Sequence, residues 1–126
     1  MRRLPTAVVG FVLVLTACTA TPSGTPLGIE TAGFQLGSGA CGGVGIPPFR
    51  IERDGDSLRY TEVGTGPIRI IWPFGFSARL QDGRAVLYAS DGAVVGREGD
   101  VLDEIGACPR SDGAFLAESV GTRTYR

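Results

Sequence analysis

The chain has 126 residues, of which 13 are acidic and 12 basic, and its formal net charge is −1. Every basic residue is Arg, and the sequence contains no His, the commonest metal ligand and the usual general base near neutral pH. Zinc hydrolases and Ser/His/Asp triads are therefore excluded, nucleic acid is not an expected partner of a mildly acidic chain, and no cofactor or metal site is expected.

The first element along the chain has the form of a secretory signal. Residues 1–3 carry two Arg, and the apolar stretch 4–15 is too short for a permanent membrane-spanning helix. The stretch ends in the sequence Leu-Thr-Ala-Cys at 15–18, which resembles the lipobox of bacterial lipoproteins. The resemblance implies cleavage before Cys18, a diacylglyceryl group on its thiol and a fatty acyl chain such as palmitate on its new amino group. The alternatives are an ordinary signal peptide with a chance cysteine and an uncleaved signal anchor.

The resemblance also implies a location and a division of the chain. Residues 1–17 would be the signal peptide, and the mature protein would be held by Cys18 on the extracytoplasmic face of the cell membrane. Residues 18–28 are almost all Thr, Ser, Pro, Gly and Ala, a composition typical of a flexible spacer, either bare or carrying O-glycans. Residues 29–126 form a single small β-domain in this interpretation.

Two cysteines remain once Cys18 is assigned to the lipid. Cys41 and Cys108 would then face an oxidising compartment, where a disulfide is the default expectation. The alternative is a redox pair, but no Cys-x-x-Cys spacing supports it.

From residue 49 onward, short alternating segments are separated by turn dipeptides. We expect strands at 49–53, 58–62, 68–72, 76–81, 84–90, 93–97 and 101–105. Asp-Gly or Gly-Asp pairs join several of them, a strong signal for antiparallel hairpins. Residues 115–120 add a strand or a helical turn, and 121–126 are expected to fray. The fold class predicted is all-β, as a small antiparallel barrel or meander.

The segment from 79 to 105 resembles the second half of an OB-like barrel. The aromatic sequence Trp-Pro-Phe-Gly-Phe at 72–76 and the Gly-Asp-Val turn at 99–101 are similar to stretches of small exported actinobacterial β-domains of unknown function. Trp72, Phe74 and Phe76 form the candidate binding surface if their rings are exposed. In the alternative interpretation, Trp72 and Phe76 point inward and belong to the core.

These features predict a binding or scaffolding module of the cell envelope, without enzymatic activity, whose partner is an envelope protein or a glycan. One alternative is a small hydrolase that uses carboxylates such as Asp100 and Glu104, with Asp103 between them, which would require a cleft. Another is a carrier of an apolar ligand, which would require an apolar cavity of about 300 Å³ or more.

Overall fold

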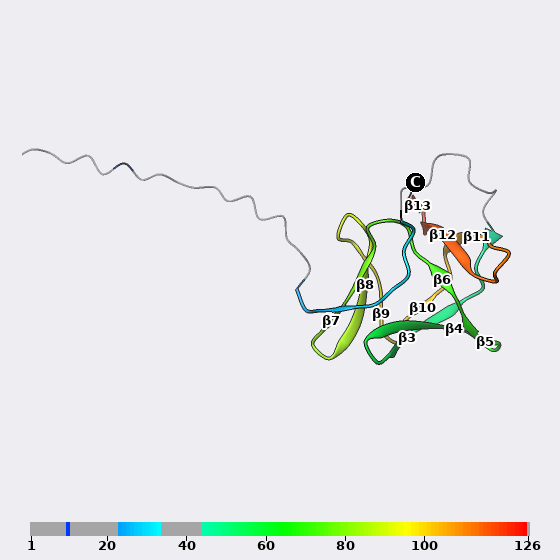
Figure 1. Ribbon diagram of the computed structural model, residues 1–126, viewed down its shortest axis with the longest axis horizontal. Coiled ribbons are helices and arrows are strands. Elements are labelled where there is room, and N and C mark those ends of the chain that lie inside the picture. The colour runs from blue at the N-terminus through cyan, green and yellow to red at the C-terminus, as the bar shows by residue number, and fades with distance from the viewer. Residues whose placement is uncertain (1–9, 11–22, 34–43, 126) are drawn as a thin grey trace, which may run out of the picture.

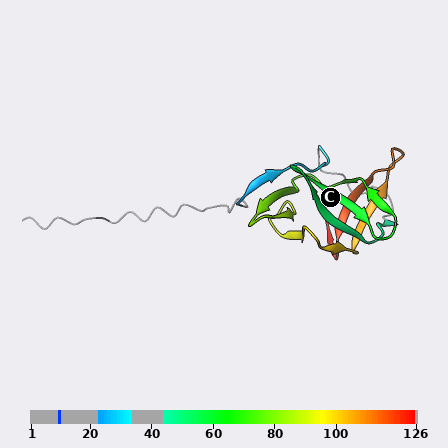
Figure 2. The same ribbon diagram turned by 90° about the horizontal axis from the view of Figure 1, so that it is seen from below.

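The computed structural model describes residues 10, 23–33 and 44–125, and this part of the chain is all-β, with no helix. Figures 1 and 2 show the described strands gathered into one body. The described strands are β1 (Thr25–Leu27), β2 (Val44–Gly45), β3 (Phe49–Asp54), β4 (Ser57–Glu62), β5 (Gly66–Ile68), β6 (Ile70–Ile71), β7 (Ser77–Gln81), β8 (Arg84–Tyr88), β9 (Val94–Arg97), β10 (Val101–Leu102), β11 (Ile105–Pro109), β12 (Phe115–Val120) and β13 (Arg123–Thr124). The all-β prediction is confirmed.

The strands form three sheets, with the orders β1-β7-β8-β9, β10-β3-β4-β5 and β13-β12-β11-β2. Their neighbours are antiparallel, except that β6 lies beside β12 in parallel. Among the described strands no sheet closes on itself, so the barrel prediction, with its OB-like form, is wrong. Closure needs one continuous ladder of hydrogen bonds, whereas this chain repeatedly leaves one sheet for another.

The hairpins lie where the turn dipeptides predicted them. Gly55 adopts a φ of +59° between β3 and β4, and the register pairs Asp54 with Ser57 across the turn. Between β7 and β8, Asp82 and Gly83 both have positive φ, of +50° and +76°, as a two-residue primed turn requires. The meander part of the prediction therefore holds for consecutive strands.

The predicted central strand at 68–72 is instead a crossing point between two sheets. β5 pairs with β4 and ends at Ile68, whereas β6 begins at Ile70 and pairs with β12. Arg69 separates them. The apolar residues after it are buried because the chain passes between sheets there, with Ile70 1% and Trp72 0% exposed. The predicted strand at 101–105 is divided in the same way, into β10 and the start of β11.

Residues 24–32, which we call the strap, contact two of the sheets and the segment that follows β6. β1 pairs with β7, Gly28 bridges to Ser57 at the start of β4, and Thr31 bridges in parallel to Trp72. The flexible-spacer prediction for 18–28 is thus wrong for residues 25–27, because their backbone hydrogen bonds are satisfied by the edge of β7. The Thr and Pro that suggested a spacer are equally compatible with an edge strand.

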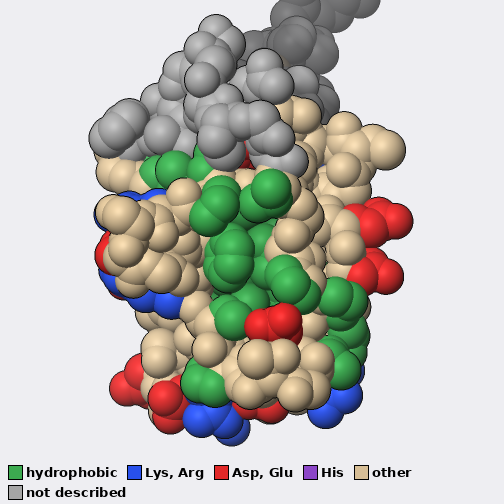
Figure 3. Space-filling model, turned by 90° about the vertical axis from the view of Figure 1, so that its right-hand side faces the viewer, with side chains coloured by type: hydrophobic (Ala, Val, Ile, Leu, Met, Phe, Trp, Pro, Cys, Tyr) green, Lys and Arg blue, Asp and Glu red, His purple; other side chains and the backbone are tan. Residues whose placement is uncertain are grey.

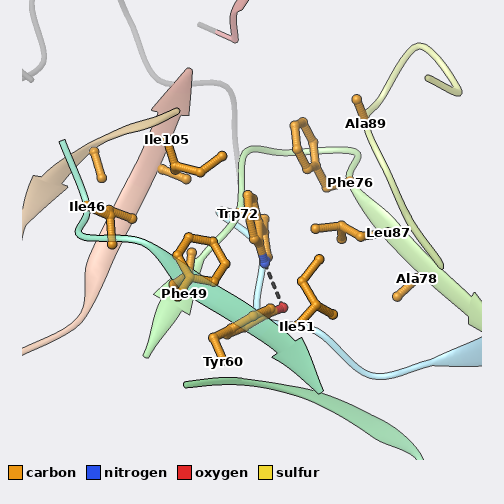
Figure 4. Close-up of a cluster of buried hydrophobic side chains, with 13 residues drawn as sticks. Ile46, Phe49, Ile51, Tyr60, Trp72, Phe76, Ala78, Leu87, Ala89 and Ile105 are labelled. Carbon is orange, nitrogen blue, oxygen red and sulfur yellow. Dashed lines mark hydrogen bonds between the residues drawn. The ribbon is translucent and has the colours of Figure 1, made fainter. Parts of the chain in front are cut away.

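The core lies between the sheets and is centred on aromatic rings, as Figure 4 shows. The Trp72 ring stacks on Phe76 with centroids 5.8 Å apart and meets Tyr60 edge to face at 5.7 Å. The Trp72 indole donates a hydrogen bond of 2.7 Å from Nε1 to the Tyr60 hydroxyl. Phe49 and Trp72 are both fully buried in this core.

The last residues of the chain are tied to the domain rather than frayed. β13 pairs with the end of β12, and the ring of Tyr125 meets Phe76 edge to face at 4.8 Å. Arg123 also forms a 2.9 Å ion pair with Asp91, in the turn between β8 and β9. The fraying prediction is therefore wrong for residues 121–125, because Tyr125 contributes to the core.

Candidate functional site

Three segments lie side by side in parallel next to the sheet β13-β12-β11-β2: part of the strap, the segment 70–72 and the first half of β12. Residues 30–32 of the strap flank Trp72, and β6 flanks the first half of β12, with Ile71 opposite Leu116. Successive side chains of an extended strand point to opposite faces. Ile70 and Trp72 belong to the core, so Arg69 and Ile71 face outward.

An open groove of about 350 Å³ lies on this outward face. Its lining combines an apolar floor with a charged rim: Glu30, Thr31, Ala32, Gly33, Arg69, Ile71, Arg110 and Leu116. Its volume is at the lower end of the range for small-ligand sites. It is a surface groove and is separate from the packed core.

The charged rim is a chain of ion pairs between distant parts of the sequence. Arg69 binds Glu30 through two hydrogen bonds, Nε to Oε2 at 2.7 Å and Nη2 to Oε1 at 2.9 Å. Its Nη1 also lies 3.4 Å from Oδ2 of Asp112, which is 3.2 Å from Nη2 of Arg110. Forked pairing of this kind fixes the plane of a guanidinium group. The Arg69 and Glu30 side chains thus form a fixed wall of the groove.

The acidic members of the rim are held in their charged form. The hydrogen bonds from Arg69 keep the pKa of Glu30 below its usual value of 4.5. The pKa of Asp112 is also lowered, first because the Ala114 N–H donates a hydrogen bond to its carboxylate and then because Arg110 and Arg69 are near. The rim therefore keeps its ion pairs over the neutral and mildly acidic range.

A second hollow of about 190 Å³ lies over β3, β4 and the turn after β4. Its main polar feature is Glu52, whose Oε2 accepts hydrogen bonds from Arg59 at 2.8 Å and Thr61 at 3.0 Å. Of its described lining residues, Val63 alone has a hydrophobic side chain. We regard the larger groove as the candidate site because it joins apolar and charged groups in one place.

Figure 3 shows hydrophobic side chains gathered down the middle of one face of the molecule, with charged side chains around them. This is the side of Figure 1 that carries β5 and β11. Val44 of β2 and Val63, just before β5, are among the exposed large hydrophobic residues, at 48% and 59%. The exposed apolar surface of this domain is therefore substantial, but these valines are not part of the groove lining.

The structure divides the predicted aromatic surface. Trp72 and Phe76 are 0% and 5% exposed and belong to the core, so they cannot act as a stacking platform. Phe74 is 53% exposed, in the turn before β7. A single exposed ring remains of the candidate surface, and the alternative in which Trp72 and Phe76 are core residues is correct.

Asp100 and Glu104, the carboxylates of the alternative hydrolase prediction, have different structural surroundings. Asp100 accepts a 2.8 Å hydrogen bond from the Arg97 N–H through Oδ2 and so closes its own turn. Glu104 lies in the link between β10 and β11, where its carbonyl oxygen accepts from the Gly121 N–H at 2.7 Å. Neither residue lines the two hollows described above.

The remaining site predictions concern the cysteines. Cys18 and Cys41 lie outside the described residues. Cys108 lies in β11, is 8% exposed, and is opposite Leu116 in the register of β11 and β12. Its pairing with Cys41 stays a prediction.

The sequence interpretation did not identify the residues that line the groove. Glu30 and Arg69 are 39 residues apart, and Arg69 and Asp112 are 43 apart, so no local spacing connects them. The one available signal was Arg69 itself, which interrupts an otherwise apolar run from Ile68 to Trp72. A charge at such a position indicates a side chain that points out of the core.

Within the described part of the chain, no cluster of three or more His, Cys, Asp and Glu is placed to hold a metal ion. A search of the same residues finds no helix with the length and hydrophobicity needed to cross a membrane. No protein-family model, curated protein or solved structure matches the chain.

Proposed function

We propose that this protein is a lipid-anchored binding module on the extracytoplasmic face of the cell membrane. The observation that carries the binding role is the groove, in which Ile71 and Leu116 form an apolar floor beside the guanidinium groups of Arg69 and Arg110. Such a mixture of apolar surface and a few oriented polar groups is typical of ligand sites. The lipobox ending in Cys18 supports the location.

The binding role is tested by placing a photo-crosslinking amino acid in the groove in living cells. The position is Leu116, in the groove floor, and the matched control is Val94, an exposed valine on β9 at 42%. A crosslinked envelope component is expected from position 116 and not from position 94. No adduct at 116, or equal adducts at both positions, would remove the proposed binding role.

The anchor is tested by metabolic labelling with a fatty acid. The wild-type chain should incorporate label and fractionate with membranes, whereas Cys18→Ala should lose both properties because the thioether cannot form. Two buried acyl chains give stable anchoring, since each methylene contributes about 0.8 kcal/mol. Label that persists in Cys18→Ala would contradict the lipobox interpretation.

We also propose that Cys41 and Cys108 form a disulfide. Support comes from the oxidising compartment expected of an exported chain, where paired cysteines form disulfides by default. Closing a loop of this length stabilises the fold by about 4 kcal/mol in the chain-entropy model. Intact mass before and after reduction and alkylation is the test, and two alkylated cysteines at 41 and 108 without reduction would exclude the bond.

A further inference from the structure

The sheet β1-β7-β8-β9 carries three arginines on its outward face, Arg79, Arg84 and Arg97, which we call the basic patch. We infer that the basic patch lies against the anionic headgroups of the membrane that holds the protein. The inference rests on the proposed location, because it requires Cys18 to be the anchor. The partner that it names, an anionic lipid surface, is separate from any occupant of the groove.

The backbone register shows which side chains share this face. Ala78 of β7 and Leu87 of β8 are opposite each other and belong to the core. Because successive side chains of a strand point to opposite faces, their neighbours Arg79 and Val86 point outward. Arg97 of β9 is opposite Val86 and therefore lies on the same face. The outward row across the three strands thus has an arginine on each side of a valine.

The third arginine lies in the next outward row. Arg84 is the first residue of β8, two positions before Val86, and is opposite Gln81 at the end of β7. It is therefore on the same face as the other two arginines. The strands β1, β7, β8 and β9 contain no Asp or Glu within their bounds. The face is thus positively charged, although the chain as a whole has a formal net charge of −1.

The arginines of the basic patch have no carboxylate partners. Among the described residues, the ion pairs involve other arginines. Arg79 instead donates from Nη1 to the carbonyl oxygen of Gly24 at 3.1 Å, and Arg84 donates from Nη2 to that of Glu98 at 2.7 Å. The buried Nε of Arg79 finds no hydrogen-bond acceptor in the described part of the chain. The positive charges of the patch are therefore not neutralised by direct contact with an acidic side chain.

The nearby carboxylates belong to the turns that follow the strands. Asp91 and Glu98 are each paired with an arginine of another segment, at 2.9 Å and 3.4 Å. Asp100 accepts a hydrogen bond from the backbone N–H of Arg97, and Asp82 occupies the turn between β7 and β8. Even when Asp82 and Asp100 are both counted against the three arginines, one positive charge remains in excess. Electrostatic attraction therefore favours an anionic partner.

The chain enters the fold beside the basic patch. The side chain of Gln81, which is opposite Arg84, donates from Nε2 to the carbonyl oxygen of Ser23, and β1 then runs along β7 (Figure 1). The proposed anchor, Cys18, is five residues before Ser23. Val94 lies at the other end of β9 from Arg97 and outside the patch. The tether therefore holds the patch near lipid at a high effective concentration, and this is the reason for choosing a membrane as the partner.

The chemistry of the patch suits phosphate headgroups. A guanidinium presents its N–H donors in a planar fork that can bind two phosphate oxygens at once. Basic side chains close to an anionic membrane surface each add to the attraction, and the contribution falls off within a Debye length. Three arginines beside a lipid anchor would thus orient the domain on the membrane rather than replace the anchor.

The test measures binding of the mature chain, residues 18–126 with Cys18→Ser, to lipid vesicles. The vesicles contain phosphatidylcholine alone or an equal mixture of phosphatidylcholine and phosphatidylglycerol. Binding to the mixed vesicles should be the tighter and should weaken between about 0.02 M and about 0.5 M salt, because salt screens charged contacts. A nitroxide-labelled lipid in the mixed vesicles should broaden the amide signals of β7 and β8 more than those of β12.

Arg84→Gln should weaken binding to the mixed vesicles about fivefold, the effect expected of one basic side chain at an anionic surface. Arg97→Gln should act in the same way, and Arg84→Lys, which keeps the charge, should bind like the wild type. The matched control is Arg50→Gln, which should change binding little. Arg50 is exposed and, among the described residues, has no ion pair, but it belongs to β3 in another sheet.

Equal binding to neutral and mixed vesicles, or equal losses for Arg84→Gln and Arg50→Gln, would overturn the inference. Binding to soluble polyglutamate but not to the mixed vesicles would assign the patch to an acidic protein and would overturn it as well. The vesicle test needs no lipid on Cys18, so its failure is distinguishable from a failure of the fatty-acid labelling that tests the anchor.

Discussion

Trp72 donates a hydrogen bond of 2.7 Å from its indole nitrogen to the hydroxyl of Tyr60 inside the core. Tyr60 belongs to β4, whereas Trp72 lies in the segment that follows β6. Their exposed fractions are 5% and 0%, so water does not replace this bond. The two aromatic rings are therefore held together by their packing and by one buried hydrogen bond.

Tyr60→Phe should lower the free energy of unfolding by about 1 to 3 kcal/mol. The substitution keeps the ring but leaves the buried Trp72 N–H without an acceptor, which costs its desolvation. Urea unfolding monitored by tryptophan fluorescence measures the change. The matched control is Tyr88→Phe, since the Tyr88 hydroxyl donates to the partly exposed Gln81 at 2.6 Å. A loss for Tyr60→Phe no larger than that for the control would contradict the role assigned to the buried bond.

The free energy of unfolding should fall in alkaline solution because the Tyr60 hydroxyl is buried in the folded protein. Burial raises the pKa of Tyr60 above its usual value of 10.0, so the unfolded chain ionises at a lower pH than the folded chain. The contribution of this group is fully present below about pH 10 and is lost as the pH rises further, by about 1.4 kcal/mol per pH unit.

Urea unfolding of the wild type and Tyr60→Phe between pH 8 and about 11.5 checks this, because Phe cannot ionise. The difference between the two proteins should shrink as the pH rises through the tyrosine range. Parallel curves over the whole range would show that Tyr60 is not protected from ionisation by the fold.

Gly96→Ala should destabilise the fold by about 1 to 3 kcal/mol through overpacking. A Cβ at Gly96 in β9 would lie 2.8 Å from Cδ1 of Ile51 and 3.1 Å from Cδ2 of Leu102, where two sheets meet. The control is Gly45→Ala, since a Cβ there meets nothing within 4 Å and should change stability little.

A double-mutant cycle tests the cause of the Gly96 effect. Ile51→Val removes the Cδ1 atom that the new methyl group would meet, so Gly96→Ala should cost less in the Ile51→Val protein than in the wild type. Thermal or urea unfolding of the four proteins gives the coupling energy. Additive effects would mean that the clash lies elsewhere.

The ion pair between Glu30 and Arg69 should add a small, pH-dependent stabilisation. The hydrogen bonds from Arg69 lower the pKa of Glu30, so the stabilisation is present above its usual value of 4.5 and is lost as the pH falls below it. The Glu30 side chain is 50% exposed, so solvent limits the effect to about 1 kcal/mol or less.

The measurement is the melting temperature of the wild type and Glu30→Gln between about pH 7 and pH 3, the range in which carboxylates titrate. The two proteins should differ at pH 7 and converge at pH 3. Glu62→Gln is the control, because Glu62 has no ion pair among the described residues. A constant difference between wild type and Glu30→Gln at every pH would contradict a role for the Glu30 charge.

The hairpins could be predicted because their causes are local. Asp82 and Gly83 occupy the two positive-φ positions of a two-residue turn, and this preference is a property of the dipeptide alone. The alternation of Phe49 and Ile51 with charged residues likewise predicted a strand at 49–53, and both side chains are buried in the structure.

The arrangement of the sheets could not be predicted in the same way. A continuous apolar run at 68–72 indicates burial, but it does not say whether one strand is buried on both faces or the chain passes from one sheet to another. The structure shows the second case, since β5 and β6 have different partners. The groove depends on this crossing at Arg69, and its acidic and basic residues meet only through tertiary contacts.

The strap shortens the segment of chain between the proposed lipid anchor at Cys18 and the folded domain. With Cys18 as the proposed anchor, the first contact of the described chain with the domain is at Ser23, whose carbonyl oxygen accepts a hydrogen bond from the Gln81 side chain, just before Gly24 and β1. Residues 18–22 then separate the anchor from this contact, and a fully extended chain of this length reaches about 17 Å. The domain would therefore sit close to the lipid headgroups and sample only the layer of the envelope next to the membrane.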